Sequence, residues 1–183
     1  MPTAGTRKPA GCMDSDLEQT IQSIAVALNE RFRHCKSIGR LKAIHGLPTL
    51  RKTVEDVVKE RARERFAGEP DQIDDVFDHI LVHSRNLQDH VRTVFDEAGA
   101  RAGETVSEDV DAEIDAHRKT VQQTDAALIV ALNEFRALRS GNGGTGDFQE
   151  AVECALMNTL DTPDDPQFDD ELRMISERIA AIT

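Results

Sequence analysis

Apolar residues recur at steps of three and four along most of the chain, a spacing that predicts amphipathic helices. The first helix is expected to begin after Asp14 or Ser15, which are both suitable N-cap residues, and to end at Gly46-Leu47-Pro48. Its apolar face consists of Leu17, Ile21, Ile24, Leu28, Phe32, Cys35, Ile38 and Leu41. Two more helices are predicted over roughly 49–66 and 71–95, the first of them with an apolar face of Val54, Val57, Val58 and Ala62.

The remainder of the chain repeats this helical pattern in a shorter form. A long helix is predicted over 110–139, followed by shorter helices over 148–160 and 167–182. Trp and Tyr are absent, so the core must consist mainly of Leu, Ile, Val and Ala, a composition that suits helix packing. We therefore expect an all-α fold.

One heptapeptide occurs almost unchanged in both halves of the chain. Residues 24–30 and 128–134 share the sequence Val-Ala-Leu-Asn-Glu at an offset of 104 residues, which indicates an internal duplication. We expect a flexible tail over 1–13, a first repeat over 14–95, a linker over 96–108 and a second repeat over 109–183. At the same offset Arg31 corresponds to Phe135, Lys42 to Gly146 and Asp14 to Arg118. The charged residues are therefore divided between two halves that would build one site.

Composition restricts the classes of partner and compartment. The net charge of −12 argues against a nucleic-acid-binding surface, which needs a clustered excess of Lys and Arg. We find neither a signal-peptide pattern nor an apolar run of the roughly 20 residues that would cross a bilayer, so we expect a cytoplasmic protein with no membrane partner. The three cysteines lie far apart and indicate neither a disulfide framework nor a zinc site.

Several polar residues lie on or beside the predicted apolar faces. Lys42 follows Arg31 by eleven residues, which returns to within about 20° of the same helix face. Ser84 and Gln88, four residues apart, interrupt the apolar face of the third helix, and Arg118 lies on the inward line of the fourth. Buried cations with no carboxylate nearby in sequence are costly, so the pattern predicts a small anionic ligand.

In content, order and spacing these residues resemble the all-helical chorismate mutase family. The resemblance is carried by Leu28-Asn-Glu-Arg31, Ile38-Gly-Arg-Leu-Lys42, Gly46-Leu-Pro-Thr-Leu-Arg51 and Ile80-Leu-Val-His-Ser84-Arg-Asn-Leu-Gln88. It covers most of residues 14–95 and implies the rearrangement of chorismate to prephenate without a cofactor or a metal.

The resemblance also implies how the two halves would cooperate. In that family a three-helix chain dimerises, and each pocket receives an arginine from the first helix of the partner. This position is Asp14 in the first repeat and Arg118 in the second. With Phe135 and Gly146 in its own pocket, the second repeat resembles a degenerate copy, so the chain is expected to be a monomeric, intramolecular pseudo-dimer with one working site.

The resemblance assigns roles to seven residues. The catalytic set is Arg31 and Arg118, which would bind the substrate carboxylates, and Lys42 and Gln88, which would donate hydrogen bonds to the ether oxygen. Arg51, Lys52 and Ser84 form the substrate-binding set. Lys52 departs from the family, which usually has a glutamate after the second-helix arginine to receive the ring hydroxyl. Either Lys52 points to solvent or the ring substituent is recognised differently.

Because Lys52 replaces the usual glutamate, two related activities remain alternatives. Enzymes that resemble this family remove pyruvate from isochorismate or rearrange 4-amino-4-deoxychorismate. A non-catalytic helical partner or regulatory protein is another alternative, although the retained pocket residues of the first repeat argue against it. Weaker interpretations are a metal site at His79, His83 and His90, a phosphate-binding loop over 141–146 and a calcium loop over 161–170.

Overall fold

The computed structural model describes residues 15–49, 52–98, 109–141 and 148–183. These residues form six helices and no strand: α1 (Ser15–Ile44), α2 (Lys52–Arg65), α3 (Pro70–Glu97), α4 (Val110–Gly141), α5 (Phe148–Thr159) and α6 (Pro166–Ala180). The all-α prediction is therefore confirmed. The predicted tail 1–13, most of the predicted linker and positions Asp14, Arg51 and Gly146 lie outside the described residues.

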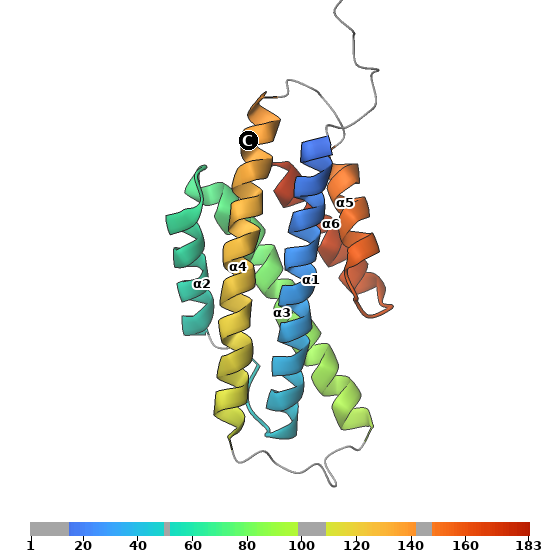
Figure 1. Cartoon of the computed structure of the whole chain (residues 1–183). Coiled ribbons are helices and arrows are strands. Elements are labelled where there is room, and N and C mark those ends of the chain that lie inside the picture. The colour runs from blue at the N-terminus through green and yellow to red at the C-terminus, as the bar shows by residue number, and fades with distance from the viewer. Residues whose placement is uncertain (1–14, 50–51, 99–108, 142–147) are drawn as a thin grey trace, which may run out of the picture.

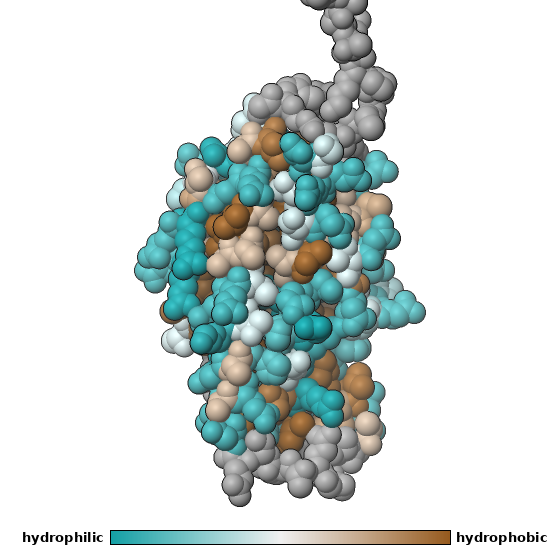
Figure 2. Space-filling view, viewed as in Figure 1, coloured by the Kyte–Doolittle hydropathy of each residue, from teal (hydrophilic) through white to brown (hydrophobic). Residues whose placement is uncertain are grey.

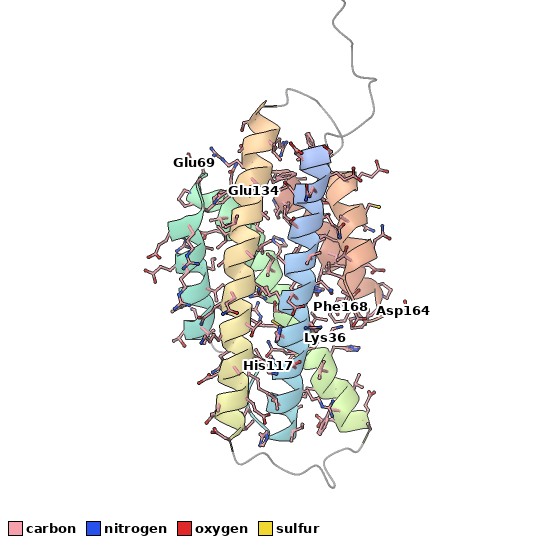
Figure 3. All side chains as sticks on the ribbon, in the orientation of Figure 1. Lys36, Glu69, His117, Glu134, Asp164 and Phe168 are labelled. Atoms are coloured by element: carbon pink, nitrogen blue, oxygen red, sulfur yellow. The ribbon has the colours of Figure 1, made fainter. Side chains whose placement is uncertain are left out.

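The two long helices α1 and α4 lie side by side and run in opposite directions, and α3 crosses behind them (Figure 1). α2 packs against α3 and α4 on one side of the bundle, whereas α5 packs against α6 and α1 on the other. On this second side, Lys36 of α1 points toward the segment between α5 and α6 (Figure 3), where its Nζ donates to Asp161. Each of the two shorter helices therefore packs against the helix that follows it and against one of the two long helices: α2 against α3 and α4, and α5 against α6 and α1.

Local signals account for the ends of the helices. Gly46 has a φ of +65°, and the Leu47 amide donates to the Lys42 carbonyl at 2.8 Å, which closes the end of α1 before Pro48. α3 and α6 each begin with a proline, one residue earlier than the periodicity suggests, because the first helical position needs no amide hydrogen. At α6 the side chain of Asp165 accepts a hydrogen bond from the Gln167 amide at 2.9 Å.

The predicted apolar face of α2 is partly wrong. Val54 is 41% exposed and Val57 is 43% exposed, whereas Ala62 is buried. The helix packs through the line of Val58 and Ala62, spaced four residues apart and continued by Phe66 just beyond its end. α2 thus meets the bundle along a narrow seam, and its first turns border a cavity.

Most of the buried apolar side chains form one cluster that extends through α1, α3, α4, α5 and α6. The face seen in Figure 2 is mainly hydrophilic, with scattered apolar side chains. None of the described helices is long and apolar enough to cross a membrane.

Candidate active site

A cavity lies between α1, α2, α3 and α4, and four helices contribute its polar side chains. The structure brings together five of the seven predicted site residues on its wall: Arg31, Lys42, Ser84, Gln88 and Arg118. Apolar residues, Ile38, Val54, Val58, Leu81 and Val121, complete much of the lining. Cationic donors in an apolar enclosure suit a small anion with an apolar ring.

Arg31 is held on α1 by partners from two other helices. It is 2% exposed, and its Nε donates to Oδ1 of Asp125 on α4 at 2.6 Å. Its Nη1 donates to the hydroxyl of Ser84, which in turn donates to the Ile80 carbonyl at 2.6 Å. The guanidinium therefore has a fixed orientation, as a bidentate carboxylate binder requires.

Asp125 corrects one step of the sequence argument. Arg31 does not depend on an outside anion for charge compensation, because it pairs with a carboxylate 94 residues away in the sequence. Burial raises the pKa of Asp125, and the Arg31 guanidinium opposes that effect. Asp125 follows Arg118 by seven residues, so it lies on the same face of α4, but only the antiparallel contact of α1 with α4 shows that it reaches Arg31.

Lys42 and Gln88 meet at one end of the cavity. The Lys42 ammonium donates to Oε1 of Gln88 at 3.1 Å and to the carbonyl of Thr49 at 2.7 Å. Because an ammonium group only donates, the amide oxygen of Gln88 faces Lys42 and its NH₂ group is left to donate elsewhere. Both side chains carry hydrogen-bond donors, and both line the cavity.

Gly39 permits this arrangement. A Cβ atom at position 39 would lie 2.8 Å from the Cα of Gln88 and 3.1 Å from its Cβ. The absence of a side chain lets α1 and α3 approach closely one turn before Lys42. The position of Gln88 relative to Lys42 thus depends on a glycine.

Arg118 enters the same cavity from the second half of the chain. Its side chain is 24% exposed, and its Nη1 donates to Asp115 of the preceding helical turn at 2.7 Å. It lies on the wall formed by α4, beside Val121 and Gln122. An arginine from beyond residue 109 thus faces a cavity whose other cations come from the first half.

Sequence reasoning missed an ion pair in the lining. Nη1 of Arg85 lies 2.7 Å from Oε1 and 2.6 Å from Oε2 of Glu55, and both residues line the cavity. Glu55 lies three residues after Lys52 on α2, and Arg85 directly follows Ser84. The available signal was their place near predicted residues, one turn after Lys52 for Glu55 and directly after Ser84 for Arg85.

The two other predicted site residues do not contribute to the described cavity. Lys52 is exposed at the first position of α2 and does not line it, and Arg51 lies outside the described residues. In the second half, Phe135 is fully buried and packs edge-on against Phe148 at 6.3 Å between ring centroids. The position that the expected duplication would align with Arg31 is therefore part of the apolar core.

The histidines considered as metal ligands have other neighbours. His83 is fully buried between Phe32 and Phe168, and its Nδ1 lies 2.6 Å from Oε2 of Glu171. Nδ1 of His79 lies 2.8 Å from the carbonyl oxygen of Asp75. His83 is thus a core residue that joins α3 to α6 rather than a surface imidazole.

Part of the chain is similar to a known family. The family model for chorismate mutase type II matches residues 22–89, a span that contains Arg31, Lys42, Ser84 and Gln88 but ends before Arg118. No curated protein and no solved structure matches the chain significantly. Residues 22–89, with the cavity residues that they contribute, are thus similar to the chorismate mutase type II family.

Proposed function

We propose that the chain is a chorismate mutase that rearranges chorismate to prephenate in a single site built from both of its halves. The observation that carries this proposal is the convergence of Arg31, Lys42, Ser84, Gln88 and Arg118 on one cavity. The family match supports activity of the chorismate mutase type for residues 22–89, and the contribution of Arg118 is our addition.

The reaction is an intramolecular rearrangement, so the site has to provide shape and charge rather than a nucleophile. The substrate carries two carboxylates, which Arg118 and Arg31 would bind, with the Ser84 hydroxyl beside Arg31. Because Asp125 occupies the Nε edge of Arg31, a carboxylate would bind elsewhere on that guanidinium. The fixed cations would hold the enolpyruvyl arm folded over the ring, in the geometry from which the bonds exchange.

Lys42 and Gln88 would act on the ether oxygen. The C–O bond breaks while the new C–C bond forms, and negative charge grows on this oxygen in the transition state. A preorganised donor aimed at developing charge contributes roughly 3 kcal/mol in comparable sites. Gln88 is neutral and can donate without being protonated, so we expect activity to be flat across neutral pH.

Glu55 could supply the carboxylate that is missing at position 52. The carboxylate that the family usually places just after its second-helix arginine is absent at position 52, but Glu55 lies one turn further along α2 and lines the cavity. We propose that Glu55 receives the ring hydroxyl while Arg85 fixes its orientation. Lys52 would then remain in solvent.

The pseudo-dimer is supported by a substitution across α1 and α4. At the offset of 104 residues, the counterparts of the Arg31–Asp125 ion pair are Phe135 and Ile21. These two residues belong to the same apolar core cluster. One half would thus retain a polar pair beside a cavity, whereas the other has replaced it with apolar packing.

The test is to incubate the purified chain separately with chorismate and with isochorismate and to identify the products chromatographically. We expect prephenate from chorismate and no salicylate or pyruvate from isochorismate, and we expect Lys42→Ala to abolish most of the conversion. Dominant release of salicylate would instead assign the chain as a lyase, and no conversion of either substrate would favour a non-catalytic role.

A further inference from the structure

A second concave site lies on the outer side of the same helices, in a groove between α2 and α4. Its polar wall is formed by Arg61 and Arg65 of α2 and Lys119 of α4. Gln122, Gln123 and Asp125 add polar groups, and Val58, Ala126 and Ile129 supply an apolar floor. The groove has a volume of about 460 Å³, and α2 and α4 lie side by side along it (Figure 1).

The three cations of the groove differ from the other cations of α2. Lys59 and Arg63 each lie 2.7 Å from a carboxylate of α3, Asp78 and Asp74 respectively. In the part of the chain that the structure describes, the side chains of Arg61, Arg65 and Lys119 form no hydrogen bond or ion pair. The chain has 34 acidic and 22 basic residues, so carboxylates are abundant. Among the described residues, however, none forms an ion pair with these three, although Asp125 lines the same groove.

Asp125 forms the boundary between the groove and the cavity. Its Oδ1 accepts from Arg31, whereas its Oδ2 is buried without a hydrogen-bond partner among the described residues. A buried carboxylate oxygen without a partner is costly, and a bridging water molecule between it and the ligand would satisfy it. Val58 and Gln122 line both spaces, so the groove is continuous with the wall of the candidate active site.

We propose that this groove binds a second small ligand, an anion with an apolar body such as an aryl carboxylate or an aryl phosphate. The anionic group would bind Arg61, Arg65 and Lys119, and the ring would lie on Val58, Ala126 and Ile129. Figure 2 shows hydrophilic side chains along α2 beside apolar side chains over the upper part of α4, which is the amphipathic character that such a ligand needs. Two arginines four residues apart on one helix face suit the several oxygens of a carboxylate or phosphate.

The site is tested with phenyl phosphate as the probe, titrated into the full-length chain and followed by calorimetry and amide NMR shifts. Inorganic phosphate, titrated in parallel, measures the contribution of the charge alone. We expect saturable one-to-one binding, with shifts concentrated along the facing sides of α2 and α4 and weaker affinity for inorganic phosphate. This binding measurement needs no turnover, so an absence of binding would not affect the proposed function. An absence of chorismate mutase activity would likewise not affect the proposed groove.

Three variants locate the bound probe. Arg65→Gln should weaken phenyl phosphate binding by about tenfold or more, as expected for the loss of one charge-assisted contact. Arg63→Gln is the matched control, because it removes the same charge from the same helix but on the side that faces Asp74, and it should change the affinity less than twofold. Lys42→Ala, in the catalytic cavity, should also leave the affinity unchanged.

Three results would overturn the proposal. They are an absence of saturable binding, equal weakening by Arg63→Gln and Arg65→Gln, and loss of binding in Lys42→Ala. The second result would show that the probe responds to the overall charge of α2 rather than to a defined site. The third would place the probe in the catalytic cavity.

Discussion

Substituting Gly39 with alanine changes a single methyl group at the closest approach of α1 to α3. The new Cβ would lie 2.8 Å from the Cα of Gln88 and 3.1 Å from its Cβ and Cγ. Carbon atoms prefer separations of about 3.5–4.0 Å, so the two helices would have to part locally by up to about 1 Å. The Cα of Gln88 belongs to the α3 backbone, so a side-chain rotation cannot relieve the contact.

Two effects of different size follow from this displacement. Inserting a methyl group into a closely packed contact typically costs about 1–3 kcal/mol of folding stability. The same displacement moves the Gln88 amide away from Lys42, to whose ammonium group its oxygen is bonded at 3.1 Å. A misplacement of about 1 Å at a reacting centre can reduce turnover by roughly a hundredfold. We therefore expect kcat to fall by between about ten- and a hundredfold, while the helices persist.

The assay combines the initial rate of prephenate formation with thermal unfolding, and Ile24→Val is the matched control. Ile24 lies on the same helix and is fully buried in the main core cluster, but it does not line the cavity. Its shortening should cost about 0.5–1.5 kcal/mol of stability and leave turnover intact. Near-normal turnover in Gly39→Ala would refute the reasoning, and an equal loss in both variants would attribute the effect to stability alone.

Three further outcomes are expected. Lys42→Ala should lower kcat by several hundredfold, because a lost transition-state donor costs roughly 3–4 kcal/mol, and near-normal turnover would show that the site has been misplaced. Glu55→Gln should raise KM or lower kcat while Lys52→Ala changes neither, and the reverse order in steady-state kinetics would return the recognition of the ring hydroxyl to Lys52. Burial and the neighbouring His34, whose Nδ1 lies 2.8 Å from Nδ1 of His117, hold the pKa of His117 below its ordinary value of 6.5. Because the unfolded chain then binds a proton at His117 more readily than the folded chain does, the folded state should lose stability as the pH falls below about 6.5. Urea unfolding at pH 7.5 and 5.5 should show this loss in the native chain and less of it in His117→Gln, and identical losses would exclude His117 as the cause.

Local periodicity and spacing were sufficient to predict the helices and most of the candidate cavity. Arg31 and Lys42 recur on one face of a single helix, and Ser84 and Gln88 do so on another, so the 3.6-residue repeat brings each pair together before any packing is known. The end of the first helix followed in the same way from Gly46-Leu47-Pro48. These features depend on neighbours in the sequence, which explains why they could be predicted.

Other features depend on tertiary contacts between distant residues. The pairing of Arg31 with Asp125 needs the antiparallel packing of α1 against α4, and that of Glu55 with Arg85 needs the packing of α2 against α3. The valines at the start of α2 looked like core positions because the sequence does not show that this helix packs along a narrow seam. His83 was considered from the sequence only as a possible metal ligand, and only the packing of α3 against α6 shows that it is buried beside Glu171.

The central claim is that one working site takes residues from both halves of the chain, and Arg118→Ala tests it most directly. The matched control is Arg136→Ala, which removes the same kind of side chain from the same helix. Arg136 does not line the cavity, and its Nε donates to the carbonyl of Thr183. The measurement is kcat/KM for the conversion of chorismate to prephenate at low ionic strength. The account predicts a loss of about a hundredfold or more in Arg118→Ala, as for a lost contact with a charged group, and a value within about twofold of the native chain in Arg136→Ala. Native activity in Arg118→Ala would contradict it.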